Sequence, residues 1–262
     1  MQLLRKFVYT LLCVLGVSVA NAAEVPIIAA AADLKFALVE VADHFKQDTG
    51  KEVKLTFGSS GNFTQQIAQG APFEIFLSAD ENFVFQLADK NLTINRGVLY
   101  AIGRLVLFSP NGSSLKVDAD LQDLKDSIQD SRLKHFAIAN PEHAPYGRAA
   151  KAVLQHLGIW LTIEPKLVLG ENASQAMQFA ASGSSQGGIV PLSLSKAPAI
   201  AKLGSFALIP ANWHAQEPLH QRMVLLKSAS ATAETFYNYL QKPAAREIFV
   251  RYGFVLPNEP GR

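Results

Sequence analysis

Short apolar runs alternate with amphipathic segments along most of this 262-residue sequence, and polar turns separate them. The run at residues 25–31 is short and apolar, whereas the apolar residues between 34 and 45 recur at intervals of three and four. The first pattern is typical of a buried strand and the second of an amphipathic helix, with Asp33 as its expected N-cap. This alternation predicts an α/β fold with a parallel or mixed sheet and helices on both of its faces.

The same strand and helix unit recurs towards the C-terminus. Further strands are expected at residues 51–57, 73–77, 99–109, 135–139, 166–169, 188–192 and 206–210. Further helices are expected before Gly70 and at residues 83–88, 121–129, 148–157, 174–181, 236–240 and 244–252. We expect a domain boundary near Arg104 and the return of the chain along the strand at 206–210, with a second hinge near Ile209. The predicted domains are a first lobe of residues 23–103 plus 210–262 and a second lobe of residues 104–209.

The N-terminal segment predicts export from the cell. Arg5 and Lys6 precede an unbroken apolar run at residues 7–19, and the small-residue sequence Ala20-Asn21-Ala22 follows it. This order is that of a cleavable secretory signal peptide, and the apolar run is too short to cross a bilayer as a stable helix. We therefore expect residues 1–22 to be removed from the mature protein.

Cysteine content and net charge limit how the mature chain can be stabilised and what it can bind. Cys13 is the one cysteine and lies in the signal segment, so the mature chain must be held together by its core. Cleavage removes two basic residues from a chain with 24 basic and 22 acidic residues, which leaves it close to neutral. A neutral protein offers no electrostatic basis for capturing nucleic acid. The six histidines lack the close spacing of a zinc site, so we expect no metal bound directly by side chains.

Hydroxyl groups and free backbone amides gather where predicted helices begin. Gly58-Ser59-Ser60-Gly61 opens one helix, Pro145-Tyr146-Gly147 opens another, and Asn172-Ala173-Ser174 opens a third. Neutral donors and helix N-termini are suited to holding a tetrahedral oxyanion in a dry site. A single Ser-Ser-Gly turn is more often a helix cap, but three donor turns at matching positions favour an anion site.

Five segments, spread in the same order over nearly the whole mature chain, resemble those of the periplasmic molybdate-binding proteins. They are Ala29-Ala30-Ala31-Ala32-Asp33-Leu34, Phe57-Gly58-Ser59-Ser60-Gly61-Asn62, Gly70-Ala71-Pro72-Phe73 with Leu77-Ser78-Ala79-Asp80, Asn140-Pro141-Glu142-His143-Ala144-Pro145-Tyr146-Gly147, and Arg251-Tyr252-Gly253-Phe254. The resemblance implies an α/β protein with the two-lobed type II periplasmic binding protein fold, in which mixed sheets are flanked by helices and two hinge strands join the lobes. It also implies a periplasmic protein that binds molybdate or tungstate, without a cofactor, for the membrane permease of an ABC importer. We expect a monomer.

The resemblance further implies which residues hold the anion: Ala32 and Asp33 after the first strand, Ser60 after the second, and Tyr146 and Ala173 in the other lobe. Family members commonly carry Ser or Thr at or beside the position of Asp33, whereas Ala32 has no hydroxyl. A carboxylate would repel a dianion. We therefore expect the Asp33 side chain to turn back and cap its helix while its backbone N–H faces the anion.

Other residues could contribute to the same site. Ser59 and Asn62 could offset the missing hydroxyl. Pro191 stands where some family members have a ligand tyrosine, and proline has neither a hydroxyl nor an N–H. The phenol is therefore expected from Tyr146. Arg148 could reach the anion, although a solvated position in the first helical turn is the more common role of such a residue.

Three other classes of protein could have a similar fold. A secreted α/β hydrolase would need an activated nucleophile, and the sequence has no His-Glu-x-x-His motif and no Gly-Lys-Ser phosphate loop, so we expect no enzyme. A binding protein for sulfate or phosphate could use the same fold and donors, with cavity size as the difference. A transcriptional regulator would carry a helix-turn-helix before the lobes, where a signal peptide stands here.

Overall fold

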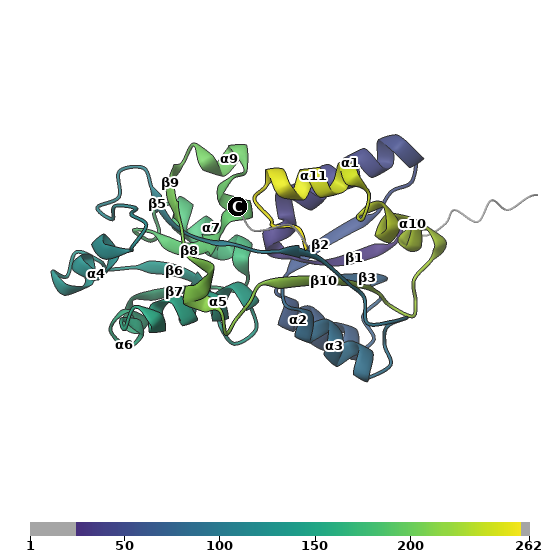
Figure 1. The fold of residues 1–262 in the computed structure, drawn as a ribbon, viewed down its shortest axis with the longest axis horizontal. Coiled ribbons are helices and arrows are strands. Elements are labelled where there is room, and N and C mark those ends of the chain that lie inside the picture. The colour runs from purple at the N-terminus through teal and green to yellow at the C-terminus, as the bar shows by residue number, and fades with distance from the viewer. Residues whose placement is uncertain (1–24, 258–262) are drawn as a thin grey trace, which may run out of the picture.

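The structure, a computed structural model that describes residues 25–257, contains two five-stranded sheets arranged along the long axis of the molecule (Figure 1). The first sheet has the order β2 (Lys54–Gly58), β1 (Ile27–Ala31), β3 (Ile75–Ser78), β10 (His220–Leu225) and β4 (Val98–Ile102). The second has the order β7 (Leu167–Gly170), β6 (Phe136–Ala139), β8 (Gly188–Pro191), β5 (Leu105–Pro110) and β9 (Gly204–Leu208). We call each sheet with its helices a lobe. The predicted signal peptide and Cys13 lie outside the described residues.

The two sheets have the same pairing pattern. In the first, β1 pairs in parallel with β2 and β3, and β10 runs antiparallel to β3 and β4. In the second, β6 pairs in parallel with β7 and β8, and β5 runs antiparallel to β8 and β9. The carboxyl ends of three parallel strands thus lie together in each sheet, where ligands of α/β proteins bind.

Helices cover both faces of the first sheet (Figure 1). They are η1 (Ala32–Leu34), α1 (Lys35–Thr49), α2 (Ser60–Ala68), α3 (Glu81–Asp89), α10 (Ala231–Tyr239) and α11 (Pro243–Arg251). Side chains alternate along a strand. In β1, therefore, Ile28 and Ala30 pack into the core with α1, α10 and α11, whereas Ala29 packs into the core with α2 and α3. Within residues 25–257, no helix is both long and apolar enough to cross a membrane.

The start of α1 differs from the prediction. The helix ends at Gly50, whose φ of 68° suits glycine and whose N–H donates to the carbonyl of Lys46. At its other end, however, no side chain caps η1 or α1. The expected helix cap by the Asp33 side chain is therefore wrong. That side chain is buried, and its Oδ2 accepts from Gln221 of β10 instead of from a backbone N–H of the helix.

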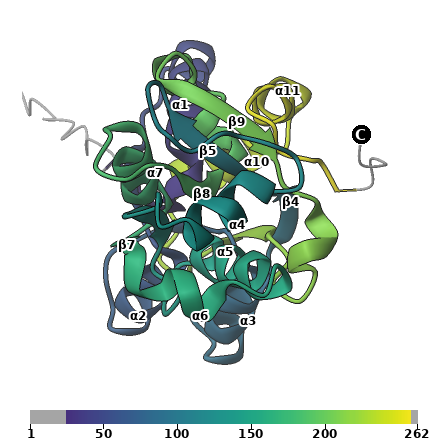
Figure 2. The ribbon, with the colours of Figure 1, turned by 90° about the vertical axis from the view of Figure 1, so that its left-hand side faces the viewer.

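Helices also surround the second sheet, whose lobe is turned towards the viewer in Figure 2. They are α4 (Gln122–Gln129), α5 (Pro145–His156), α6 (Trp160–Ile163), η2 (Glu164–Lys166), α7 (Ala173–Ala181), α8 (Leu192–Ser195) and α9 (Pro198–Ala201). A single cluster of buried apolar residues joins α4, α5 and α7 to the strands, with Phe108 and Phe136 fully buried in it. The predicted α/β fold of two mixed sheets flanked by helices is confirmed.

The chain passes between the sheets twice. The apolar stretch at 99–109 forms parts of two strands, since β4 belongs to the first sheet and β5 to the second. The strand expected at 206–210 corresponds to β9, which pairs with β5 inside the second sheet, and the chain leaves that sheet after it. The short turn η3 (Ala211–His214) and then β10 return it to the first sheet. The exact domain bounds and the hinges near Arg104 and Ile209 stay predictions.

Candidate functional site

The turn η1 and the N-terminal ends of α2, α5 and α7 meet at one small cavity between the lobes. Its lining residues are Ala31, Ala32, Asp33, Gly58, Ser59, Ser60 and Ala79 from the first lobe and Ala144, Pro145, Tyr146 and Ala173 from the second. The cavity thus brings together six residues that the sequence singled out: Ala32, Asp33, Ser59, Ser60, Tyr146 and Ala173. No lysine, arginine or histidine is among the lining residues.

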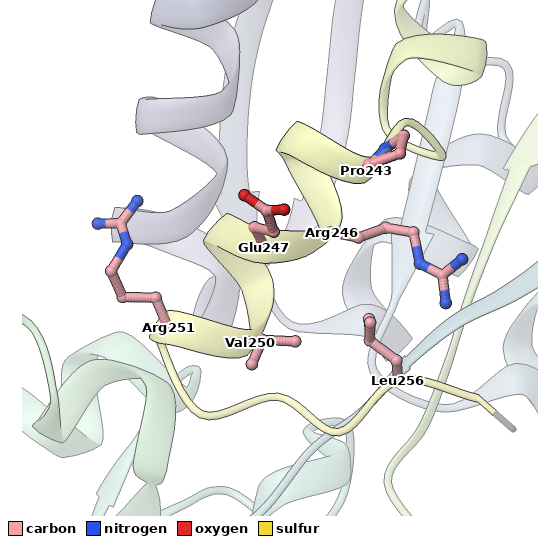
Figure 3. A pocket seen from close by; sticks show the side chains of 6 residues that line it. All are labelled: Pro243, Arg246, Glu247, Val250, Arg251 and Leu256. Atoms are coloured by element: carbon pink, nitrogen blue, oxygen red, sulfur yellow. The ribbon is translucent and has the colours of Figure 1, made fainter. Parts of the chain in front are cut away.

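A larger hollow lies beside α11. It is lined by Pro243, Arg246, Glu247, Val250, Arg251 and Leu256 (Figure 3). The guanidinium groups of Arg246 and Arg251 point in opposite directions in this view, so they do not converge on one ligand. All six residues belong to one C-terminal stretch of the first lobe. The small cavity between the lobes is therefore the candidate site.

The adjacent serines of the first lobe have different surroundings. Ser59 is the N-cap of α2, and its Oγ accepts from the Asn62 N–H at 3.3 Å and lies 3.0 Å from His143 Nδ1 of the second lobe. Ser60 is fully buried, and its Oγ accepts from the Ala79 N–H at 3.0 Å. That bond leaves the Ser60 hydroxyl proton free to donate. As the first residue of α2, Ser60 also has an N–H without an acceptor inside the helix.

The second lobe contributes backbone N–H groups and one phenol. Tyr146 is the second residue of α5, after Pro145, and Ala173 is the first residue of α7. N–H groups at these positions have no acceptor inside their helices and lie at the positive ends of the helix dipoles. Burial and the nearby charge of Asp33 raise the pKa of the Tyr146 phenol well above its usual value of 10. The phenol therefore stays protonated and can donate.

Asp33 is the one carboxyl residue in the lining, and its side chain is buried. Its Oδ2 accepts from Gln221 Nε2 at 2.5 Å, whereas its Oδ1 has no hydrogen-bond partner within the part of the chain that the structure describes. Burial raises the pKa of Asp33 from 3.8 to about 6, while the amide of Gln221 and the phenol of Tyr146 lower it by less.

Gln221 is a residue that sequence reasoning missed. It lies on β10, is fully buried, and donates from Nε2 to Asp33 Oδ2 and, at 3.2 Å, to the Tyr146 hydroxyl. Its Oε1 accepts from the Tyr100 hydroxyl at 2.8 Å. Gln221 thus joins residues of three elements beside the cavity. The segment at 220–225 has three polar residues followed by three apolar ones, so it lacks the alternation that would have indicated a strand with Gln221 on its buried face.

Contacts between the lobes surround the cavity. The Gly61 N–H donates to the His143 carbonyl at 3.0 Å. Arg148 of α5 forms ion pairs with Asp80 of the first lobe and, at 2.9 Å, with Glu217. Arg148 is therefore neither a solvated first-turn residue nor part of the cavity lining. Its ion pair with Asp80 links the second lobe to the first.

Two further candidates also lie outside the lining. Asn62 is within α2, and its N–H is bonded to Ser59 Oγ. Pro191 ends β8, and its carbonyl accepts from Ser195 Oγ at 3.1 Å. Neither residue is placed by the structure to donate into the cavity.

The segment Gly183-Ser184-Ser185-Gln186-Gly187 fits the Gly-x-Ser-x-Gly pattern of hydrolases, a match that sequence reasoning overlooked. In hydrolases this serine lies on a turn from a strand into a helix, whereas Ser185 lies between α7 and β8, on a turn from a helix into a strand. Its hydroxyl donates to the carbonyls of Phe179, at 3.1 Å, and Gly187, at 2.9 Å. Among residues 25–257, no histidine bonds to Ser185 and no cluster of His, Cys, Asp or Glu could hold a metal ion.

Comparisons with known proteins agree with this geometry. The family of bacterial extracellular solute-binding proteins matches residues 27–255. The molybdate-binding protein ModA of Rhodobacter capsulatus is 38% identical over 258 residues, which cover 97% of each chain. ModA of Escherichia coli is 34% identical over 229 residues, which cover 87% of each chain.

A solved structure shows the same fold. The periplasmic molybdate-binding protein of Azotobacter vinelandii aligns with a TM-score of 0.81 and 34% identity, over 89% of this chain and 100% of that one. The expectation of a binding protein and not an enzyme is confirmed by these relatives. The sequence likeness over nearly the whole chain and the shared two-lobed fold place this chain in the family of periplasmic molybdate-binding proteins.

Proposed function

We propose that this protein captures molybdate or tungstate in the cavity between its lobes and delivers it to an ABC importer. The observation that carries this proposal is the convergence of neutral donors from both lobes on one small buried cavity without a cationic side chain. The metal enters as an oxyanion, so protein groups bind its oxygen atoms and no side chain needs to coordinate the metal.

The donors suit a tetrahedral dianion. The Ser60 hydroxyl, the Tyr146 phenol and the N–H groups of Ser60, Tyr146 and Ala173 come from opposite sides of the cavity. Hydrogen bonds to a charged acceptor are stronger than bonds between neutral groups, and the helix dipoles add to them. Ala32 contributes no side-chain donor, so its role is limited to its backbone.

Binding would favour the closed arrangement of the lobes. Donors from η1 and α2 reach the same anion as donors from α5 and α7 only when the lobes are together. An anion that contacts both lobes therefore shifts the population towards closure. The bond from Gly61 to the His143 carbonyl and the Arg148 bridge to Asp80 form in that same state.

The cellular setting follows from the same family. The relative of known structure is described as periplasmic, and the substrate-binding component of an ABC transporter requires a membrane permease as its partner. We infer that residues 1–22 are a signal peptide that directs this chain to the periplasm. We also infer that the protein acts as a monomer, since one chain supplies both walls of the cavity.

Isothermal titration of the mature protein with molybdate, tungstate, sulfate and phosphate in parallel tests the proposal. We expect molybdate and tungstate to bind with similar affinity and sulfate to bind more weakly, since its shorter bonds to oxygen leave the donors out of reach. Tightest binding of sulfate or phosphate would support the alternative of another oxyanion receptor. Absence of binding by all four anions would contradict the proposed function.

A further inference from the structure

Asp33 is an unusual residue for the wall of an anion site, because it brings a carboxyl group where the ligand brings negative charge. Its side chain is 1% exposed, so water cannot screen the two charges. Its Oδ2 accepts from Gln221, but its Oδ1 is buried without a hydrogen-bond partner among residues 25–257. A buried polar atom without a partner is uncommon and calls for a ligand, water or proton that satisfies it.

Within residues 25–257, no cationic side chain is among the groups that act on the Asp33 carboxyl. The helices α7 and α8, which pack against η1, contain no titratable side chain. On α1, Lys35 lies over the Phe36 ring, 6.0 Å from its centroid. On β2, Lys54 is exposed at the far end of the strand, opposite Ile27. The lysines of the neighbouring elements are therefore directed elsewhere.

The groups on β10, β4 and α5 do not supply a positive charge either. On β10, Arg222 and His220 flank Gln221, and both bind Glu81. Burial and the charge of Asp33 raise the pKa values of Tyr100 and Tyr146 well above 10, so both phenols stay neutral. Ser193 of α8 donates its hydroxyl at 2.8 Å to the backbone carbonyl of Asp33 and leaves the carboxyl unaffected.

We propose that one proton is held between Asp33 Oδ1 and the bound oxyanion, so that each fully deprotonated dianion enters the site together with one proton from solvent. The protonated carboxyl then donates to an oxygen of the ligand and takes the place of the hydroxyl that Ala32 lacks. This proposal rests on the proposed function and adds a pH dependence to it.

The direction of the pH dependence follows from burial. Burial already raises the pKa of Asp33 to about 6 without a ligand, and a dianion beside it raises this pKa further. At pH 8 the carboxyl of the free protein is therefore mostly ionised, and binding takes up a proton. Affinity for a dianion is highest below about pH 6 and falls by up to about tenfold per pH unit above it, until the pKa of the complex is reached.

The test is titration of the mature wild-type protein and of Asp33→Asn with molybdate between pH 6.5 and 9, in buffers of different ionisation enthalpy. We expect the wild type to take up close to one proton per molybdate at pH 8. In Asp33→Asn, an amide N–H replaces the acid without titrating. This variant should take up no proton, keep the same affinity across the range, and bind at least about tenfold more tightly than the wild type at pH 8.

Controls separate this proposal from the proposed function. Asp126→Asn removes an exposed carboxyl of α4 and should leave the proton count and the pH slope as in the wild type. The proton count of the wild type needs no variant and stands even if Asp33→Asn does not fold. Tight binding without proton uptake would overturn the shared proton and leave the proposed function intact. If neither protein bound molybdate or tungstate at any pH, the proposed function itself would fail.

Discussion

The two lobes share one sheet topology but bring different chemistry to the cavity. Asp33 follows β1 in the first sheet as Tyr146 follows β6 in the second, and Ser60 follows β2 as Ala173 follows β7. The first lobe presents a carboxyl and a hydroxyl group at these positions. The second presents a phenol and the N–H of a residue whose side chain has no polar atom.

This difference shows at which positions the hydrogen-bond donor depends on the residue type. A backbone N–H at a helix N-terminus is available whatever the side chain, provided that the helix begins there. A side-chain donor is lost with one substitution. We therefore expect the site to be sensitive to sequence in the first lobe and, except at Tyr146, tolerant in the second.

The largest expected effect concerns the buried carboxyl, which has no counterpart in the second lobe. The pKa of Asp33 is raised from 3.8 to about 6, so the folded protein binds a proton at this carboxyl more tightly than the unfolded chain does. Its contribution to stability is full below pH 3.8 and is lost as the pH rises through 6. Asp33→Asn should raise the free energy of unfolding of the ligand-free protein at pH 8 by about 3 kcal/mol, measured by urea denaturation.

The pH profile is the decisive part of that measurement. The difference between Asp33→Asn and the wild type should shrink as the pH falls from 8 towards 4, while Asp126→Asn shows no such change. A difference that is constant with pH would mean that Asp33 affects stability through packing and not through its charge.

The second-largest expected effect concerns the side-chain hydroxyl that the first lobe brings to the cavity. Ser60→Ala removes a hydroxyl that can donate to the anion and should reduce the affinity for molybdate by roughly 1.5 to 3 kcal/mol, about tenfold or more. Ser127→Ala is the matched control, since Ser127 is equally buried but donates to the Leu124 carbonyl in α4. Equal affinities of Ser60→Ala and Ser127→Ala, by calorimetry, would remove Ser60 from the site.

The smallest effect is expected in the second lobe. Ala173→Gly keeps the backbone N–H at the start of α7 and should change the affinity for molybdate by no more than about threefold, since the hydrogen bond remains. The same titration measures it. A loss of affinity as large as that caused by Ser60→Ala would contradict the expected tolerance of the second lobe to substitution.

The sequence predicted most of the residues that line the candidate cavity because its signals are local. Ser60, Tyr146 and Ala173 stand at the starts of helices that follow strands, where chain order alone indicates free donors. Gln221 was missed because its role depends on a strand far along the chain that lies between β3 and β4. The sequence left two roles open for Arg148, an anion contact and a solvated position, because its partners Asp80 and Glu217 are distant in sequence.

Local patterns in the sequence were sufficient to predict the alternation of strands and helices and the polar turns at the strand ends, because periodicity and turn chemistry act over a few residues. The two lobes with mixed sheets were predicted only through the resemblance to a known family. Tertiary structure alone decided the state of Asp33. The sequence suggested a helix cap, but burial between two lobes places its carboxyl against Gln221 and leaves Oδ1 without a partner. Burial and long-range hydrogen bonds depend on the whole fold, so no local pattern could show them.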